Sequence, residues 1–345
     1  MIQLSVVCIT RNQEWNARRL VESVLNQALP FLALEIILVD SASTDATVRV
    51  ACEYPITVIV LDADQRLTAA AGRHVGYEHS SGNFVLFLDG DMELYPGWLE
   101  QALNLLIDDP TIGAVTGTLI DRPKATPARE PMPPAIFSDS APPKDIQHGG
   151  GAALYRRAVL EEVGSFNPYL YSDEEPDLCI RIRQRGSRIV QIDHPIAMHY
   201  TDPDGQLSTL IARWRRRLYL GAGQNLRYHL GSDHFLPYLK ERGFGLAPAA
   251  ALIAGLVCLI ISLRTRSLAW FGLWLLAFAA VIALDTVRKR SLYRAIYSLV
   301  LRFAIMDGTI QGFLMQPLTA ENSPLRFAVV KVGEMMIFTP EERVI

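Results

Sequence analysis

The chain has 345 residues, of which 50% are hydrophobic and 20% are charged, and its formal net charge at pH 7 is −3. This length allows a full α/β domain with a further region, and the slightly acidic balance excludes the overall basic field typical of nucleic-acid-binding proteins. The four cysteines include no Cys-x-x-Cys pair, which excludes a zinc ribbon or dithiol redox centre and favours reduced, buried thiols.

Apolar runs alternate with helical patterns over the first 90 residues. Uninterrupted apolar runs predict strands at residues 3–10, 35–40, 56–61 and 84–89, because parallel strands covered on both faces have this pattern. Apolar residues at helical spacing predict helices between these strands, including one that starts near residue 46 and one over 67–79. The repeated order predicts an α/β fold with a doubly wound, mostly parallel sheet.

Two carboxylates, Asp89 and Asp91, end the fourth of these strands. In an extended chain, residues two apart point to the same side. Open α/β sheets bind ligands at the carboxyl ends of their strands, and paired carboxylates suit a hard divalent cation that also carries phosphate oxygens. The pair predicts an Mg²⁺ or Mn²⁺ site, with a simple Asp-Gly turn as the alternative.

The carboxylate pair belongs to one of four motifs that follow one another along the chain. They are Val39-Asp40-Ser-Ala-Ser-Thr-Asp45, Gly72-Arg73-His-Val-Gly76, Gly82-Asn-Phe-Val-Leu-Phe-Leu-Asp89-Gly-Asp91, and Gly164-Ser-Phe-Asn-Pro168 followed by Glu174-Glu175-Pro-Asp177-Leu. Over about residues 1–200 the chain resembles the family 2 glycosyltransferases, which have the GT-A fold. The resemblance implies a transferase that uses a nucleotide diphosphate sugar and a divalent cation, Mg²⁺ or Mn²⁺.

The resemblance also implies roles for individual residues. Donor-binding residues are expected at Thr10, Arg11, Asp40, Arg73 and Asp89, metal ligands at Asp89, Asp91 and His199, and acceptor contacts at Glu174 and Trp214. Glu175 is expected to be the general base, with Asp177 as its competitor, because the usual Glu-Asp pair of the family is Glu174-Glu175 here. His74 and Ser41-Ala42 depart from the usual residues, which leaves the nucleotide open.

The proline-rich stretch over residues 121–147 has no periodicity and predicts a long irregular loop on the acceptor side, with a disordered insertion as the alternative. It is followed by His148 and three glycines, a run that resembles the oxyanion loop of esterases. No Gly-x-Ser-x-Gly or Gly-x-x-x-x-Gly-Lys sequence occurs, which argues against a serine hydrolase and a P-loop ATPase.

A basic helix is predicted over residues 207–228, with Arg213 and Trp214 in its arginine cluster. Processive members of the family carry Gln-x-x-Arg-Trp here, but this chain lacks the Gln, so the sequence leaves processivity open. We expect this helix, within an interfacial region 206–245, to be attracted to anionic lipid. A stacking role of Trp214 against an acceptor sugar is the alternative.

Uncharged stretches at residues 246–263 and 268–284 are long enough to cross a bilayer and predict a transmembrane hairpin over 246–285. Basic clusters at both ends favour a cytoplasmic catalytic domain at the inner membrane, although Arg264 and Arg266 oppose this weakly. A polar stripe in residues 286–345 predicts an amphipathic interfacial helix and a tail.

We therefore predict a catalytic domain over residues 1–205 of a membrane-attached inverting glycosyltransferase. Its partners would be a nucleotide diphosphate sugar, membrane lipid, and a lipid-linked or surface-polysaccharide acceptor, with no nucleic acid. The alternatives are a polyprenyl-phosphate glycosyltransferase and a catalytically silent sugar-nucleotide-binding scaffold. The sequence leaves open the sugar, the nucleotide, the acceptor, the linkage formed and the oligomeric state. It also leaves open whether residues 292–316 span the membrane.

Overall fold

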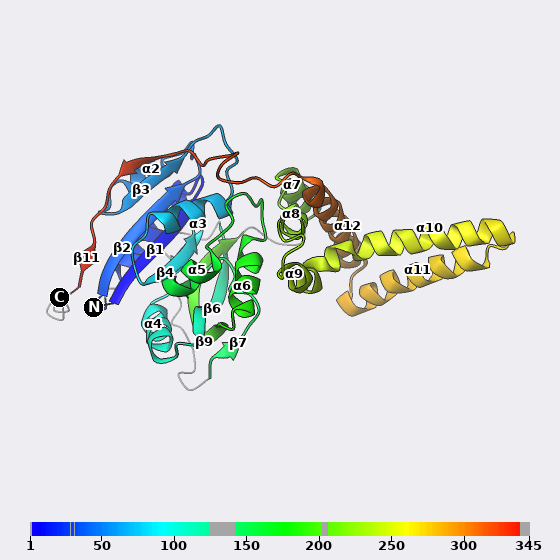
Figure 1. Ribbon diagram of the computed structural model, residues 1–345, viewed down its shortest axis with the longest axis horizontal. Helices are drawn as coiled ribbons and strands as arrows, with labels where there is room; N and C mark the ends of the chain where they lie inside the picture. The colour runs from blue at the N-terminus through cyan, green and yellow to red at the C-terminus, as the bar shows by residue number, and fades with distance from the viewer. Residues whose placement is uncertain (1, 28, 31, 125–141, 202–205, 339–345) are drawn as a thin grey trace. The chain divides into compact units, whose positions relative to one another are not determined.

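The computed structural model describes residues 2–27, 29–30, 32–124, 142–201 and 206–338. The chain divides into two compact units (Figure 1). The first contains Met1–Asp202 together with Leu318–Ile345, and the second contains Pro203–Pro317. The C-terminal tail therefore belongs to the same unit as the N-terminal segment.

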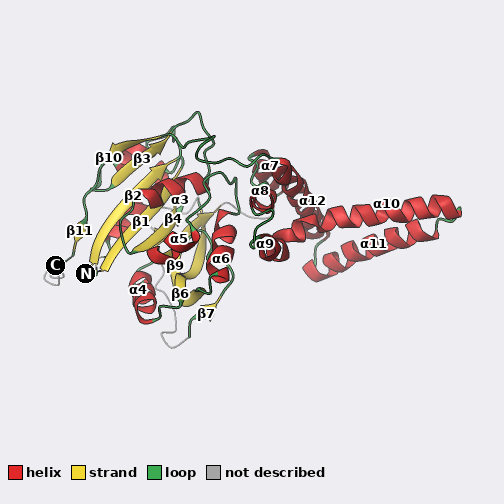
Figure 2. Ribbon diagram, viewed as in Figure 1, coloured by secondary structure: helices red, strands yellow, loops and turns green. Residues whose placement is uncertain are grey.

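Eleven strands form one sheet in the first unit, drawn yellow in Figure 2. Their order is β10-β3-β2-β1-β4-β8-β6-β9-β5, with β11 beside β2 and β7 beside β9. The strands are β1 Ile2–Thr10, β2 Leu32–Asp40, β3 Thr57–Leu61, β4 Phe84–Asp89, β5 Met92–Leu94, β6 Ile112–Pro123, β7 Lys144–Asp145, β8 Ala153–Arg156, β9 Arg188–Thr201, β10 Phe327–Lys331 and β11 Met336–Ile337.

Parallel pairing in the first half of the sheet brings three strand ends together. β1 pairs in parallel with β2 and β4, and β2 pairs in parallel with β3. In this register Thr10 lies opposite Asp40, and Ile9 lies opposite Asp89. The predicted α/β fold with a mostly parallel sheet is confirmed, and β5, β7, β8, β10 and β11 are its antiparallel members.

Helices cover both faces of the sheet because successive strand residues point to opposite sides. The helices of this unit are α1 Glu14–Leu25, α2 Thr47–Ala51, α3 Ala69–Glu78, α4 Trp98–Asp108, α5 Arg157–Val163 and α6 Glu174–Gln184. Leu86 and Leu88 of β4 belong to the core that packs against α1, α2 and α4. Val85 and Phe87 belong to the core that packs against α3, α5 and α6.

The irregular loop predicted over residues 121–147 is corrected at both ends. β6 continues through Pro123 because it pairs with β9, with Asp121 opposite His199. Lys144–Asp145 forms β7, which also pairs with β9. Residues 125–141 lie outside the described residues, so the predicted acceptor-side role of the loop stays a prediction.

The C-terminal tail adds two strands that the sequence analysis did not predict. β10 pairs antiparallel with β3 along the edge of the sheet, and β11 pairs with the start of β2. Lys331 anchors this segment, because its ammonium donates to the carbonyl oxygens of Cys52, at 2.8 Å, and Tyr54. The tail therefore covers the sheet edge that β3 would otherwise expose.

The second unit is helical: α7 Leu207–Arg215, α8 Gly221–Tyr228, α9 Phe235–Arg242, the 3₁₀ helix Gly243–Leu246, α10 Ala247–Thr265, α11 Ala269–Lys289 and α12 Leu292–Leu314. The single helix predicted over residues 207–228 is wrong. The chain breaks it at Arg217, whose φ of +63° lies outside the range of a right-handed helix.

The helices α10 and α11 form a hairpin, seen in Figure 1. Gly255 lets the Trp274 ring pack against α10, because a Cβ at Gly255 would lie 2.6 Å from the ring atom Cε2. The Trp274 ring nitrogen donates to the carbonyl oxygen of Ala251 at 3.0 Å. Segments Phe235–Thr265 and Ala269–Lys289 are long and apolar enough to cross a membrane. Within them, stretches of 18 residues have mean hydropathies of 2.5 and 1.9, and few or none of the residues in these stretches are buried. They are candidate membrane spans, judged by length and composition alone.

Candidate active site

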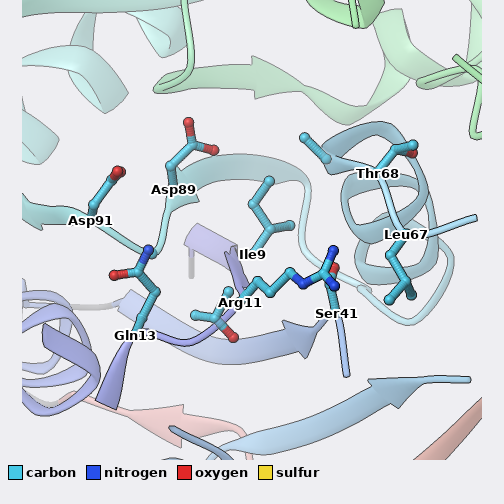
Figure 3. Close-up of a pocket in the computed structure, with 11 residues that line it drawn as sticks. Ile9, Arg11, Gln13, Ser41, Leu67, Thr68, Asp89 and Asp91 are labelled. Carbon is cyan, nitrogen blue, oxygen red and sulfur yellow. The ribbon is translucent and has the colours of Figure 1, made fainter. Parts of the chain in front are cut away.

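An open pocket of about 250 Å³ lies at the carboxyl ends of β1, β2 and β4 (Figure 3). Thr10, Arg11 and Gln13 line it from the end of β1 and the loop that follows, and Ser41 lines it from the end of β2. Leu67, Thr68 and Ala69 contribute the start of α3, and Asp89, Gly90 and Asp91 contribute the end of β4. The fold thus brings the predicted residues Thr10, Arg11, Asp89 and Asp91 into one cavity.

Asp40 lies behind the wall of this pocket. Its carboxylate is fully buried and accepts hydrogen bonds from the Thr10 hydroxyl at 2.9 Å and from the Ser43 backbone N–H at 2.7 Å. The Ser43 hydroxyl donates to the same carboxylate. These hydrogen bonds hold Thr10 and the turn after β2 in place. The base contact predicted for Asp40 stays a prediction.

Arg73 forms ion pairs with two carboxylates, and its predicted contact with the donor stays a prediction. Its guanidinium is buried on α3, donates to the Asp89 carboxylate at 2.6 Å, and forms an ion pair with Glu174. Burial raises the pKa of Asp89 and of Glu174, and the charge of Arg73 opposes both shifts. Since two carboxylates already neutralise Arg73, the exposed Arg11 in the pocket is better placed to meet a diphosphate. Glu174 is likewise engaged by Arg73.

Three strands bring Asp91, His199 and Asp121 together. His199 on β9 lies opposite Met92 of β5 on one side and opposite Asp121 of β6 on the other. The His199 Nδ1 is 2.8 Å from an Asp121 carboxylate oxygen, and its Nε2 is 3.8 Å from an Asp91 carboxylate oxygen. When Nδ1 donates its proton to Asp121, Nε2 is the ring nitrogen that lies towards Asp91 and can bind a metal ion.

The residues at this point fit a divalent cation. Atoms that each bind one cation at about 2.1 Å lie no more than about 4.2 Å apart, and the Asp91–His199 separation of 3.8 Å falls within this limit. The Asp121 carboxylate supplies the outer hydrogen bond that metal-binding histidines usually make. Sequence reasoning did not find Asp121, because the pairing of β6 with β9 joins residues 78 positions apart.

Glu175 lies in the first turn of α6, where its Oε1 atom accepts three hydrogen bonds. The backbone N–H groups of Gly149 and Gly150 and the thiol of Cys179 are the donors, with separations of 3.0 Å from Gly150 and 2.9 Å from Cys179. Asp177, its predicted competitor, is 2% exposed and forms an ion pair with Arg181 at 2.8 Å. The structure thus leaves Glu175 as the better placed of the two.

The glycines over residues 149–151 connect the two carboxylate groups. A Cβ at Gly151 would lie 2.6 Å from an Asp89 carboxylate oxygen, so only glycine allows this close approach. Gly149 lies against Glu175. Ligand atoms of His148, Glu175 and Cys179 lie within 4.8 Å of one another and form a further group that could hold a metal ion. The sequence analysis did not single out Cys179. Its position four residues after Glu175 on the same helix could have indicated that the two side chains are neighbours.

Trp214 belongs to the second unit. Its ring nitrogen donates to the Asp307 carboxylate at 2.8 Å, and 48% of the residue's surface is exposed. The acceptor contact predicted for Trp214 stays a prediction.

Replacing Arg73 with Met is expected to lower the free energy of unfolding by about 3–5 kcal/mol, because Asp89 and Glu174 would lose their shared cation. Burial raises the pKa of both carboxyl groups and Arg73 opposes this rise, so in the variant both pKa values should rise further and the folded state should bind protons that the unfolded chain releases. The loss should therefore be larger at pH 8 than at pH 5. Chemical denaturation of the detergent-solubilised full chain measures it.

The exposed Arg49→Met is the matched control and should change stability by no more than about 0.5 kcal/mol. Adding Glu174→Met to Arg73→Met should recover part of the loss, since it removes one unpaired buried charge. Equal effects of Arg49→Met and Arg73→Met would contradict this account of the ion pair.

Comparison with known proteins finds a family match over the N-terminal part of the chain. Residues 5–164 match the family model Glycosyl transferase family 2. The chain is 24% identical over 227 residues to Glycosyltransferase AglE of Haloferax volcanii, covering 64% of this chain and 72% of that protein. It is 28% identical over 224 residues to Pre-mycofactocin glycosyltransferase of Mycobacterium tuberculosis, covering 61% of this chain and 45% of that protein. The chain thus spans less than half the length of the second relative.

Solved structures share the fold. Mannosyltransferase PcManGT from Pyrobaculum calidifontis, in complex with GDP-Man and Mn²⁺, matches with a TM-score of 0.57 and 22% identity, covering 90% of this chain and 87% of that one. Residues 1–349 of Staphylococcus aureus TarS, in complex with UDP-GlcNAc, match with a TM-score of 0.50 and 16% identity, covering 98% of this chain and 100% of that one. At these identities the likeness concerns the fold.

Proposed function

We propose that this chain, whose residues 5–164 match the model of the family 2 glycosyltransferases and whose fold is of the GT-A type, transfers a sugar from a nucleotide diphosphate sugar to a membrane-linked acceptor, with inversion at the anomeric carbon. One observation carries the proposal. The open pocket of about 250 Å³ at the ends of β1, β2 and β4 is bordered by the Asp89–Asp91 pair. The loop over residues 149–151 contacts both Asp89 and Glu175.

The donor would lie in the pocket of Figure 3. Thr10 and Ser41 offer hydroxyl groups to a base or ribose, and the guanidinium of Arg11 offers paired donors to a diphosphate. The structures of PcManGT and TarS contain GDP-Man and UDP-GlcNAc, respectively, which supports a nucleotide sugar as the ligand class. The fold does not decide between these nucleotides.

Asp91 and His199 would hold a divalent cation, with Asp89 beside them. When bound, this cation would neutralise charge on the departing diphosphate. An imidazole ligand favours Mn²⁺ over Mg²⁺, because Mg²⁺ prefers oxygen ligands. The PcManGT structure contains Mn²⁺, which is consistent with this preference.

Glu175 would act as the general base. Within the described residues its Oε1 atom accepts three hydrogen bonds and its Oε2 atom accepts none, so Oε2 is the atom available to take a proton. The acceptor hydroxyl would lose its proton to Oε2 as its oxygen bonds to the anomeric carbon. The bond from that carbon to the diphosphate breaks, and its electron pair leaves with the diphosphate.

The acceptor would be held near a bilayer, either as a lipid-linked sugar or as a growing surface polysaccharide. The two candidate spans support this proposal, and the basic residues 288–290 at the C-terminal end of α11 favour the cytoplasmic side of the inner membrane. A polyprenyl phosphate acceptor is the enzymatic alternative, since phosphate needs no strong base, and a silent sugar-nucleotide-binding scaffold is the non-enzymatic one.

Membrane insertion gives a separate prediction. The full-length protein should stay in the membrane fraction after alkaline carbonate treatment, because α10 and α11 expose long apolar surfaces that are costly to place in water. Leu256→Arg in α10 and Leu276→Arg in α11 each place a charge near the middle of a helix. Each substitution should oppose insertion by about 2.5–3.5 kcal/mol and move protein to the soluble fraction.

The matched control is Ile107→Arg, which places the same charge on an exposed apolar position of the first unit and should leave fractionation unchanged. Full-length protein extracted by carbonate without detergent would contradict membrane insertion. Truncation before α10 is the poorer test, since it also removes β10 and β11 from the sheet.

A thermal-shift panel tests the donor proposal. Ligands that bind only the folded state raise the apparent melting temperature. One nucleotide sugar of the panel should raise the apparent melting temperature, and the rise should be larger with Mn²⁺ than without it. The corresponding nucleoside diphosphate should behave in the same way. No shift with any nucleotide sugar in either condition would overturn the proposed donor class.

A further inference from the structure

A second cavity lies wholly within the helical unit, where the turn after α7 faces α12. Its volume is about 380 Å³, and the residues that matter for its chemistry are Trp214, Arg215, Arg217, Tyr219, Asp307 and Gln311. Trp214 and Arg215 lie at the end of α7, Arg217 and Tyr219 lie in the turn that follows, and Asp307 and Gln311 lie on α12. None of them belongs to the catalytic unit.

The charged residues of the cavity wall are two arginines and one aspartate. Arg215 and Arg217 contribute two guanidinium groups. Asp307 is the single carboxylate among the residues that line the cavity, and its Oδ2 atom accepts from the Trp214 ring nitrogen and from the Gln311 amide, each at 2.8 Å. Asp307 is thus engaged by two donors, and the residues that line the cavity include two arginines and this one carboxylate.

The backbone presents Arg217 in an unusual conformation. Its φ is +63°, its N–H donates to the carbonyl oxygen of Trp214 at 2.9 Å, and the N–H of Leu218 donates to that of Arg213 at 3.1 Å. This is the hydrogen-bond pattern of a Schellman helix end, where glycine is the usual residue. Arg266 and Arg290 also adopt positive φ at helix ends, so the conformation alone marks no site. Arg217 differs because it lines a cavity.

Close packing against α12 holds the turn in position. A Cβ at Gly308 would lie 2.4 Å from the carbonyl oxygen of Tyr219, and one at Gly312 would lie 2.1 Å from that of Leu220. The two glycines therefore let the backbone of the turn rest directly on the helix. The cavity is consequently part of a packed helical structure and its arginines start from fixed backbone positions, which lowers the entropy cost of binding a ligand.

We propose that this cavity binds a phosphate group. Planar guanidinium groups form paired, charge-assisted hydrogen bonds with phosphate oxygens, and the tyrosine and glutamine side chains add neutral donors at the rim. The phosphate has two possible sources, a membrane lipid or a soluble anion, and two candidate membrane spans in the same unit favour the lipid. The site stands independently of the sugar donor and of the role of Glu175.

The test uses the full-length protein in detergent and measures lipid retention by native mass spectrometry. Phosphatidic acid should bind more tightly than diacylglycerol with the same acyl chains, which lacks the phosphate. Arg215→Gln and Arg217→Gly should each weaken phosphatidic acid binding by about tenfold, because each removes a charge-assisted contact. Arg217→Gly should not lower the melting temperature, since glycine adopts positive φ without strain.

Arg216→Gln is the matched control, because it removes the same charge from the same basic run at a residue that does not line the cavity. It should change the affinity by no more than about twofold. Equal losses in Arg215→Gln and Arg216→Gln, or equal retention of phosphatidic acid and diacylglycerol, would overturn the proposal. Binding of inorganic phosphate that depends on Arg215 and Arg217, without preference for phosphatidic acid, would assign the site to a soluble phosphate.

Discussion

Glu175→Gln is expected to lower turnover by at least about 100-fold while leaving the affinity for the donor nearly unchanged. Glutamine keeps the size of the side chain and can still accept the hydrogen bonds from Gly149 and Gly150. It cannot take a proton from the acceptor hydroxyl. A loss confined to the chemical step is therefore the signature of a missing base, and single-turnover kinetics with saturating donor measures it.

Asp177→Asn supplies the comparison within the same helical turn. Asp177 is buried against Arg181, so its replacement should lower stability by leaving a buried cation without its partner. Turnover per folded molecule should change by less than about threefold, because Asp177 is committed to that ion pair. If Asp177→Asn loses turnover and Glu175→Gln does not, the base is assigned to the wrong residue. If neither loses it, a phosphate acceptor becomes the better account.

Asp91→Ala is expected to abolish the Mn²⁺-dependent part of donor binding, because it removes the carboxylate that faces His199 at 3.8 Å. Calorimetry with a nucleoside diphosphate, with and without Mn²⁺, measures this part directly. The pocket itself should persist, since its other walls come from β1, β2 and α3. Metal-independent affinity should therefore stay within about threefold of the original value.

A graded series separates direct from indirect metal contacts. His199→Ala should remove most of the metal dependence, and Asp121→Asn should weaken Mn²⁺ affinity by about 10- to 100-fold, because Asp121 orients His199 from outside. Asp108→Ala, which removes an exposed carboxylate from α4, is the control and should have no effect. Unchanged Mn²⁺ dependence in Asp91→Ala would contradict this metal site.

The first half of the sheet could be predicted because its strands are local apolar runs buried on both faces. β1, β2, β3 and β4 all lie where those runs predict them, and Asp89 with Asp91 follows directly from the end of β4. The pairing of distant strands has no such local signal. β10 lies in a segment assigned to a tail, because five residues with four exposed side chains do not distinguish an edge strand from an extended tail.

Side-chain partners were the part that sequence could not supply. Arg73 matched a donor-binding position, but its two carboxylate partners are 16 and 101 residues away in the chain, so its neutralisation was visible only after folding. Asp40 likewise matched a base-contacting position, yet Thr10 and Ser43 occupy its carboxylate. Asp177, the alternative base, forms an ion pair with Arg181. The role of Glu175 as the proton acceptor stays a prediction.

The identity of the nucleotide released during turnover tests the central claim most directly. Purified full-length protein, reconstituted with bacterial lipid extract, is incubated with Mn²⁺ and the nucleotide sugar that gives the largest thermal shift, and the released nucleotide is identified by chromatography. Cleavage between the anomeric carbon and the diphosphate predicts a nucleoside diphosphate, lost in Glu175→Gln and in Asp91→Ala. Release of a nucleoside monophosphate, or release that neither substitution affects, would contradict a glycosyl transfer at this site.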